Sequence, residues 1–269
     1  MATGDTVFAG SIPALYDRFM GPMLFRPYAA DLARRLASLN SGRVLETAAG
    51  TGIVTEALVA ALPPAVEIVA TDLNQAMVDF AAAKPGMTRA RPRQADALAL
   101  PFDDGTFDVV VCQFGVMFFP DRVAGYREAK RVLGSGGRFL FNAWDSLAHN
   151  PLPALLTETV ATRFPEDPPR FFERTPHGYH EVDRIRADLA AAGFNNVTIE
   201  TVTLPSRAAS ARDAATGFCQ GSPLRGEIEA RAPGGLQSVT DAVAGALAAR
   251  FGSGAIEQPM QAHVVIARA

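Results

Sequence analysis

Short apolar runs alternate with amphipathic stretches along the first half of the chain. Each run is almost continuously apolar, which is typical of strands that are buried on both faces. The stretches between the runs carry apolar residues at the spacing of a helix. Strands that alternate with helices favour a parallel sheet built from right-handed crossovers and covered by helices. The strands predicted in this way are residues 43–47, 67–71, 88–94, 107–113 and 138–142.

Helices are predicted before the sheet and between its strands. The first crossover helix ends at Pro63 and Pro64, because proline does not continue a helix. The last crossover helix is expected to stop at the glycines 134, 136 and 137. The predicted helices are residues 12–20, 27–39, 52–62, 74–83 and 121–133.

The alternation changes after residue 144. A helix over 152–164, a proline-rich loop over 165–180, a helix over 181–192 and two strands over 196–204 and 262–267 are predicted. About fifty residues, 205–258, separate those strands, and so long a segment in a compact domain usually has structure or function of its own. We interpret it as a helical cap. No stretch rich in glycine and serine marks a linker, so residues 1–269 are expected to form a single domain.

Composition and charge narrow the class of protein. The chain has 269 residues, of which 48% are hydrophobic and 20% are charged, as in an ordinary globular protein. Its net charge of −3 disfavours a nucleic-acid partner, because domains that hold phosphates are more often basic. Two cysteines are too few for a disulfide framework or for a metal site built from thiolates, so no metal is expected.

The sequence also bears on the compartment. The first residues lack a basic stretch followed by an apolar one, so no targeting segment is expected. The strongest apolar run, residues 109–119, is interrupted by Gln113 and is too short to span a bilayer. We therefore expect a soluble cytoplasmic protein that does not enter a membrane. The sequence gives no indication of an oligomeric state.

A glycine turn follows the first predicted strand. Gly50 and Gly52 allow a sharp bend and a close approach of a ligand to the backbone, and the helix that follows offers free N–H groups. Ligands bind at the carboxyl ends of strands in open α/β sheets. Asp72 ends the second strand about twenty residues after the turn, where a carboxylate can accept hydrogen bonds from both hydroxyls of a ribose.

A third acid, Asp96, ends the third predicted strand. Its carboxylate can accept from an exocyclic amine and the N–H of Ala97 can donate to a ring nitrogen, which together would read an adenine. Glu46, Asp72 and Asp96 would then line three adjacent strand ends and suit a ligand with hydroxyls, an amine and a positive charge. A dinucleotide remains an alternative, although its fingerprint needs a small residue where this chain has Thr55.

With these residues the chain resembles the class I S-adenosylmethionine-dependent methyltransferases. The likeness is to the small-molecule enzymes grouped with those of ubiquinone and menaquinone biosynthesis, and it covers about residues 10–145. In that family the first motif is an acid followed by Gly-x-Gly-x-Gly. Here the acid is Glu46, Ala48 replaces the first glycine, and Gly50 and Gly52 match the other two.

The resemblance implies a fold and a set of cofactor contacts. The fold would be α/β and Rossmann-like, with a seven-stranded, mostly parallel sheet, an antiparallel last strand and helices on both faces. Residues 10–145 would bind the cofactor, and insertions over 145–180 and 205–257 would form helical caps over the substrate site. The implied contacts of S-adenosyl-L-methionine, or of its product S-adenosyl-L-homocysteine, are Tyr16, Glu46, Ala48, Gly50, Gly52, Asp72, Leu73, Met77, Asp96, Ala97 and Gln113.

The implied reaction is transfer of a methyl group to a small-molecule acceptor by in-line displacement at oxygen, nitrogen or carbon. A base would help a hydroxyl or a carbon nucleophile, and His149, His177 and His180 are the candidates because they lie in the first inserted region. Two alternatives stay open: a regulatory protein that binds the cofactor without catalysis, and an NAD-dependent oxidoreductase.

Overall fold

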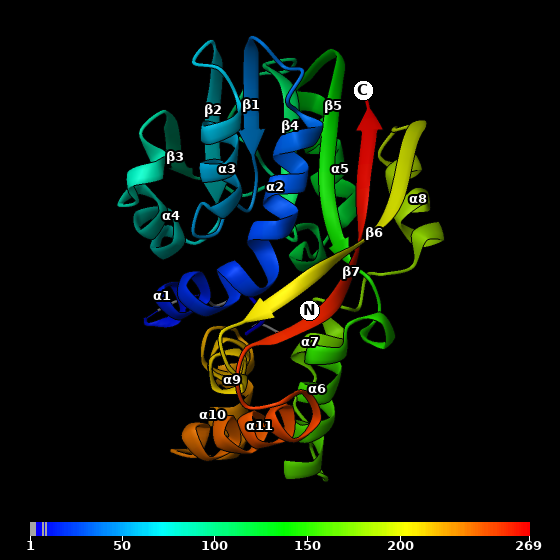
Figure 1. Ribbon diagram of the computed structural model, residues 1–269. Coiled ribbons are helices and arrows are strands. Elements are labelled where there is room, and N and C mark those ends of the chain that lie inside the picture. Colours follow the sequence, from blue (N-terminus) through cyan, green and yellow to red (C-terminus); the bar gives the residue numbers. More distant parts are fainter. Residues whose placement is uncertain (1–3, 7, 9) are drawn as a thin grey trace.

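The computed structural model describes residues 4–6, 8 and 10–269. One seven-stranded sheet runs through the molecule in the order β3-β2-β1-β4-β5-β7-β6 (Figure 1). β7 pairs antiparallel with β5 and β6, and the other pairs are parallel, so the expected Rossmann-like α/β fold is confirmed. The strands are β1 (Gly42–Glu46), β2 (Val66–Asp72), β3 (Ala90–Gln94), β4 (Phe107–Gln113), β5 (Leu133–Trp144), β6 (Asn196–Ala208) and β7 (Ile256–Arg268).

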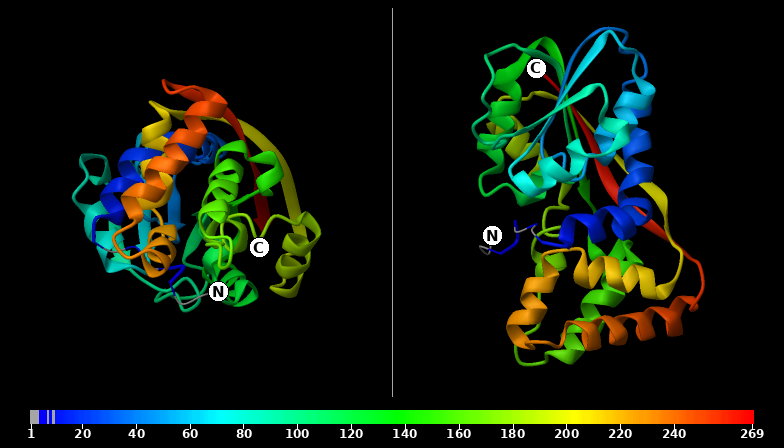
Figure 2. Two further views of the ribbon diagram at one scale, coloured as in Figure 1. Left: turned by 90° about the horizontal axis from the view of Figure 1, so that it is seen from below. Right: turned by 90° about the vertical axis from the view of Figure 1, so that its left-hand side faces the viewer.

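Helices cover both faces of the sheet (Figure 2). α2 (Arg26–Arg35) and α3 (Ile53–Ala61) pack together on one face, and α5 (Arg122–Val132) packs with α8 (Val182–Ala191) on the other. α4 (Gln75–Ala82) connects β2 to β3. Because the central strands are covered on both sides, residues such as Val110 and Phe141 are fully buried, which explains their continuous apolar runs.

The N-terminal helices form one continuous helical run, so the expected break between residues 20 and 27 is wrong. α1 (Ile12–Leu15) passes into a π-helix, η1 (Tyr16–Phe25), which passes into α2. Pro22 lies inside the π-helix. A proline would clash with the carbonyl four residues earlier in an α-helix, and the wider π turn gives it room.

β5 begins earlier than expected. The glycines 134, 136 and 137 were expected to form a loop after a helix, and they lie instead in the first part of the strand. The pairing of β4 with β5 shifts register between Phe107 and Val109, where the glycine segment enters the sheet. Glycine commonly marks such irregularities in strands, and this explains why a stop signal for a helix and the start of a strand coincide here.

β6 and β7 are longer than expected and pair along their whole length, from Asn196 with Arg268 to Ala208 with Ile256. Their far ends leave the sheet as a two-stranded ribbon that leads to the helices below it (Figure 1). The Tyr28 hydroxyl lies 2.7 Å from the Val202 carbonyl and 3.0 Å from the Met260 carbonyl. This contact joins α2 to the ribbon.

A group of helices lies beyond the ribbon. α11 packs against α9 and α6, which come from segments far apart in the sequence. α7 occupies part of the stretch that was expected to be only loop. No helix within the described residues is both long and apolar enough to cross a membrane. The helices of this group are α6 (Pro151–Arg163), α7 (Phe171–Arg174), α9 (Ala211–Gln220), α10 (Leu224–Arg231) and α11 (Leu236–Phe251).

Candidate functional site

The glycine turn lies between β1 and α3, as the sequence predicts. Gly50 and Gly52 have φ angles of 56° and 79°, in the region that favours glycine. Ala48 also has a positive φ, of 52°, at the position where the resemblance expects glycine. A Cβ built on Gly50 would meet no other atom within 4 Å, so the backbone there is open to a ligand.

Asp72 is tied to this turn. One carboxylate oxygen accepts a hydrogen bond from the Gly50 N–H at 2.8 Å, and the other accepts from the Asn74 N–H at 2.8 Å. Burial raises the pKa of Asp72, while these hydrogen bonds act in the opposite direction. The side chain is 7% exposed, and each oxygen keeps acceptor capacity for a further donor.

A wide cavity opens in front of the turn and of the carboxyl ends of β1, β2 and β4, with about 1280 Å³ of empty space including its mouth. Nine of the predicted cofactor contacts line it, so the structure brings together residues from segments spread over nearly one hundred positions of sequence. These nine are Tyr16, Ala48, Gly50, Asp72, Leu73, Met77, Asp96, Ala97 and Gln113.

Glu46 and Gly52 are not among the residues that line the cavity. Glu46 is 1% exposed and accepts a hydrogen bond from the Thr55 hydroxyl at 2.6 Å. Burial, together with the nearby charge of Asp72, raises the pKa of Glu46 to about 8. Glu46 therefore lies behind the turn rather than in front of it, and Thr55 is a partner that the sequence did not reveal.

Gln113 offers the cavity an unused acceptor. Its side-chain nitrogen donates to the Phe25 carbonyl at 3.2 Å, and its buried Oε1 has no hydrogen-bond partner among the described residues. Buried polar atoms are rarely left unpaired, so this oxygen indicates a missing donor. The acids Asp72 and Asp96 and this amide fit a ligand with hydroxyls and amines, as S-adenosylmethionine has.

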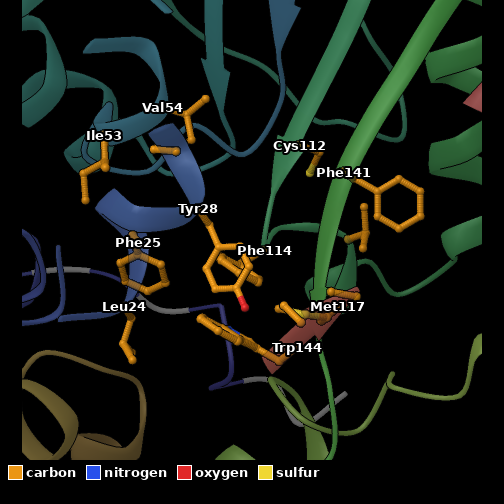
Figure 3. Packing of buried hydrophobic residues seen from close by; sticks show 14 of the residues in the cluster. Leu24, Phe25, Tyr28, Ile53, Val54, Cys112, Phe114, Met117, Phe141 and Trp144 are labelled. Carbon is orange, nitrogen blue, oxygen red and sulfur yellow. The ribbon is translucent and has the colours of Figure 1, made fainter. Parts of the chain in front are cut away.

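A second, narrower cavity adjoins the first, with about 660 Å³ of empty space. Phe8, Tyr16, Phe114 and Phe118 line both cavities and form the wall between them. Phe114 has a φ of 52°, which is rare for an aromatic residue, and its ring stacks on Trp144 at 3.7 Å (Figure 3). Strained residues of this kind cluster at functional sites.

The lining of the narrower cavity comes from the N-terminal segment, the sheet, the ribbon and the helices beyond it. Most of its side chains are aromatic or aliphatic, and none is charged. They are Phe8, Tyr16, Met20, Leu24, Phe25, Phe114, Met117, Phe118, Trp144, Asn150, Leu152, Pro153, Phe171, Phe172, Pro176, His177, Ser206, Phe218, Ser222, Pro223, Pro259 and Met260.

The three candidate histidines take different places. His177 lines the narrower cavity and is 5% exposed, and its Nδ1 lies 2.6 Å from the Asp145 carbonyl. Burial lowers the pKa of His177 to about 4. His149 is exposed and lies beside the Asp145 carboxylate at 3.2 Å, and His180 contacts the His177 carbonyl. Neither of these two lines either cavity.

Of the aromatic wall, the sequence revealed only Tyr16. Phe114 and Phe118 follow β4 directly, so their place after a strand end was a usable signal. Phe8 and Ser206 gave none, because the fold of the N-terminal segment and the extension of β6 past the sheet decide where they lie.

Comparison with known proteins gives consistent matches. Residues 44–137 match the model of a family described as "Methyltransferase domain". The ubiquinone/menaquinone biosynthesis C-methyltransferase UbiE of Ectopseudomonas mendocina is 31% identical over 60% of this chain and 68% of its own length. The enzyme of the same name from Geobacter sp. is 32% identical over 49% of this chain. The match covers only part of the length of three such relatives: 59% and 40% for the enzymes of two Geobacter species and 46% for that of Geotalea uraniireducens.

Solved structures share the fold. The YcgJ protein of Bacillus subtilis superposes with a TM-score of 0.57 at 20% identity, over 90% of this chain and 98% of that one. A phosphoethanolamine N-methyltransferase of Haemonchus contortus, solved with S-adenosylhomocysteine, gives a TM-score of 0.59 at 14% identity, over 95% of this chain and 56% of that one.

Proposed function

Because this chain belongs to the class I S-adenosylmethionine-dependent methyltransferases, in the group of the ubiquinone/menaquinone C-methyltransferases, we propose that it transfers a methyl group from S-adenosylmethionine to a small-molecule acceptor. The observation that carries the proposal is the pair of adjoining cavities with a shared aromatic wall. The wider is polar at the strand ends, and the narrower is apolar.

The wider cavity is proposed to hold the cofactor, which when bound supplies a methyl group already activated on a cationic sulfur. Asp72 would accept hydrogen bonds from the ribose hydroxyls. Asp96 and the Ala97 N–H would meet the adenine, and Leu73, which is 52% exposed, would pack on it. The unpaired Oε1 of Gln113 would accept from the amino group of the methionine part.

The narrower cavity is proposed to hold the acceptor. A molecule there would face the cofactor across Tyr16 and Phe114, and such positioning supplies about 7–11 kcal/mol in favourable cases. The segments 145–180 and 205–257 would act as caps on a single domain, since α7 and α9 place Phe171, Phe172 and Phe218 in the cavity lining. Of the candidate bases, His177 lines this cavity, so it is the one that would meet an acceptor.

The test of this proposal is binding of S-adenosylhomocysteine by calorimetry, followed by an assay of labelled methyl transfer to a panel of acceptors. Hydrogen bonds to charged groups are worth about 1.5–3 kcal/mol, so Asp72→Ala should weaken binding by about ten- to a hundred-fold. Asp79→Ala is the matched control, because Asp79 is exposed on α4 and lies outside the cavity. Asp72→Asn keeps an acceptor oxygen and guards against loss of the fold. Unchanged affinity in well-folded Asp72 variants would refute the cofactor site.

A further inference from the structure

One lysine joins three elements beside the wider cavity. Lys84 follows α4, and its Nζ lies 2.9 Å from a carboxylate oxygen of Asp17 in η1 and 2.6 Å from one of Glu56 in α3. The same atom donates to the Thr51 carbonyl in the glycine turn at 3.2 Å. An ammonium group has three protons, so these three acceptors use its full donor capacity.

The cluster is largely shielded from water. The side chains of Lys84 and Asp17 are 14% and 17% exposed, and that of Glu56 is 29% exposed. Fully exposed ion pairs contribute little, whereas a shielded pair that loses one partner leaves a charge in an unfavourable place. Because two carboxylates share one ammonium group here, removal of Lys84 leaves two like charges close together.

The segment directly after this lysine supports the glycine turn from behind. It forms a short 3₁₀ turn, η2 (Pro85–Met87), that packs on α3. A Cβ on Gly86 would come within 2.5 Å of a Glu56 carboxylate oxygen, so Glu56 reaches the lysine across the bare backbone of this glycine. A Cβ on Gly52 would lie 3.1 Å from the Met87 sulfur. The turn and this segment are therefore in close contact.

The other partner of the lysine leads to the wall between the cavities. Tyr16 directly precedes Asp17 in the first turn of η1 and lines both cavities. Its ring stacks on Phe25 at 4.7 Å. Burial, and then the charges of Asp72 and Asp17, raise the pKa of Tyr16, because the ionised phenol would face two carboxylates. A shift of Asp17 would thus move a side chain that faces the cofactor site.

Lys84 itself lines neither cavity. We propose that Lys84 is a positioning residue of the cofactor site. Its bonds to Asp17 and to the Thr51 carbonyl hold the first turn of η1 against the glycine turn, and so keep Tyr16 in the wall beside the bound cofactor. The inference rests on the proposed function in one respect, namely that the wider cavity holds the cofactor.

Release of S-adenosylhomocysteine from the full chain, followed by stopped flow, tests this role. The signal is the fluorescence of Trp144, the only tryptophan of the chain, whose ring stacks on Phe114 in the wall. Lys84→Met removes the charge and keeps a long aliphatic side chain. It should speed release by about fivefold to thirtyfold. Lys84→Arg keeps the charge and should restore release to within about twofold of the wild type.

Variants of the two acids separate positioning from stability. Asp17→Asn should speed release as Lys84→Met does, and the double variant should release no faster than Lys84→Met alone, because both changes break the same contact. Glu56→Gln breaks the other ion pair of this lysine, but Glu56 lies on α3 and not on η1. It should lower stability to urea and change the release rate by less than about twofold, whereas a merely structural cluster would make the two acid variants alike.

Lys130→Met is the matched control. Lys130 lies on α5, on the other face of the sheet, where its Nζ is 5.6 Å from the centre of the Phe194 ring, and it lines neither cavity. Its replacement by methionine should leave the release rate unchanged.

The outcomes separate this inference from the proposed function. Wild-type release rates in folded Lys84→Met and Asp17→Asn would overturn the role of Lys84 and leave the cofactor site intact, and so would equal acceleration by Glu56→Gln and Asp17→Asn. If Lys84→Met does not fold, Asp17→Asn with its Glu56→Gln comparison decides. Failure of the wild type itself to bind S-adenosylhomocysteine would refute the cofactor site and this inference with it.

Discussion

At the scale of single residues, Glu46 shows how burial changes the role of an acid. The sequence placed it with Asp72 and Asp96 at the strand ends, because all three end neighbouring strands. The structure turns its side chain to the Thr55 hydroxyl and buries it completely. Burial favours the protonated form, and the charge of Asp72 adds to the effect, so the pKa of Glu46 rises to about 8.

A pH-dependent stability follows. Glu46 holds its proton in the folded state up to about pH 8 but loses it near 4.5 when unfolded. The folded state binds more protons in this window, so Glu46 makes the protein less stable as the pH rises from 4.5 to 8. Glu46→Gln should remove this slope and be more stable than the wild type at pH 8. The free energy of unfolding of the variant minus that of the wild type should be about 2–4 kcal/mol larger at pH 8 than at pH 4.5. Urea unfolding of both proteins at a series of pH values measures it.

The control for this measurement is His177, whose effect has the opposite sign. Its pKa is lowered to about 4, so the unfolded state takes up the proton first and stability falls as the pH drops from 6.5 to 4. Glu46→Gln should leave that fall in place. If the free energy of unfolding depends on pH in the same way for Glu46→Gln and the wild type between pH 4.5 and 8, Glu46 is ionised in the folded protein.

Position along the strands decided which site residues the sequence could predict. Asp72, Asp96 and Gln113 end or follow strands, and parallel strands bring their carboxyl ends to one edge, so local pattern sufficed. Ser206 became part of a cavity only because β6 and β7 pair well beyond the sheet. Phe8 lies in the wall because it packs on Tyr16 and on Phe118, which is far away in the sequence. Long-range contacts of this kind leave no periodic signal.

At the scale of elements, the turn after β1 and the loop after β4 touch at one point. A Cβ on Gly115 would collide with the Cβ of Ala48 and lie 2.7 Å from the Cys112 sulfur. Ala48 itself has a positive φ, which costs an alanine about 1–2 kcal/mol. The methyl group of Ala48 is therefore accommodated because residue 115 has no side chain.

This contact predicts a coupling between the two loops. Gly115→Ala should destabilise the protein by about 1–3 kcal/mol through overpacking. Ala48→Gly alone should change stability by less than about 1 kcal/mol, because relief of strain is offset by greater freedom of the unfolded chain. The double variant should recover about 1 kcal/mol of the loss, as a double-mutant cycle by urea unfolding measures. The recovery is partial because the clash with Cys112 remains.

Gly245→Ala serves as the matched control, because a Cβ at that position in α11 meets no atom within 4 Å. It should be neutral or stabilising by about 0.5–1 kcal/mol, and its effect should add to that of Ala48→Gly. Additive behaviour of Gly115→Ala with Ala48→Gly would show that the loops do not press on each other.

Most elements were predictable, and the exceptions have local causes. Each central strand is bounded by turn residues and buried on both faces, so its apolar run identified it. The π-helix was missed because Gly21 and Pro22 are ordinary helix breakers, and only the packing of η1 on α9 and β6 shows why the helix continues. The glycines that open β5 gave the same signal as a helix stop.

At the scale of the whole molecule, two residues near the N-terminus contact different parts of the fold. Asp5 contacts the helices beyond the ribbon, and Phe8 contacts the wall between the two cavities. Asp5 is 2% exposed and accepts hydrogen bonds from the Arg174 guanidinium, at 3.0 Å for Nε, and from the Thr175 hydroxyl at 2.6 Å. Arg174 also pairs with Glu227 of α10 at 2.6 Å. A few residues later Phe8 packs on Tyr16 and Phe118, in the wall between the cavities. Asp5 is thus bonded to the helices beyond the ribbon and stands three positions before Phe8, a residue of the wall.

Loss of this anchor should therefore be felt at the cofactor site, although Asp5 does not line the wider cavity. Asp5→Ala removes a buried carboxylate that pairs with the partly exposed Arg174. It should cost about 1–3 kcal/mol of stability, because Arg174 keeps Glu227 as a partner. With Phe8 less firmly held, S-adenosylhomocysteine should dissociate several-fold faster, since most effects on affinity appear in the dissociation rate. Stopped-flow release measures this against Asp183→Ala, an exposed acid on α8. An unchanged release rate in a destabilised Asp5→Ala protein would show that the anchor supports the helices alone and that Phe8 is held by its aromatic neighbours.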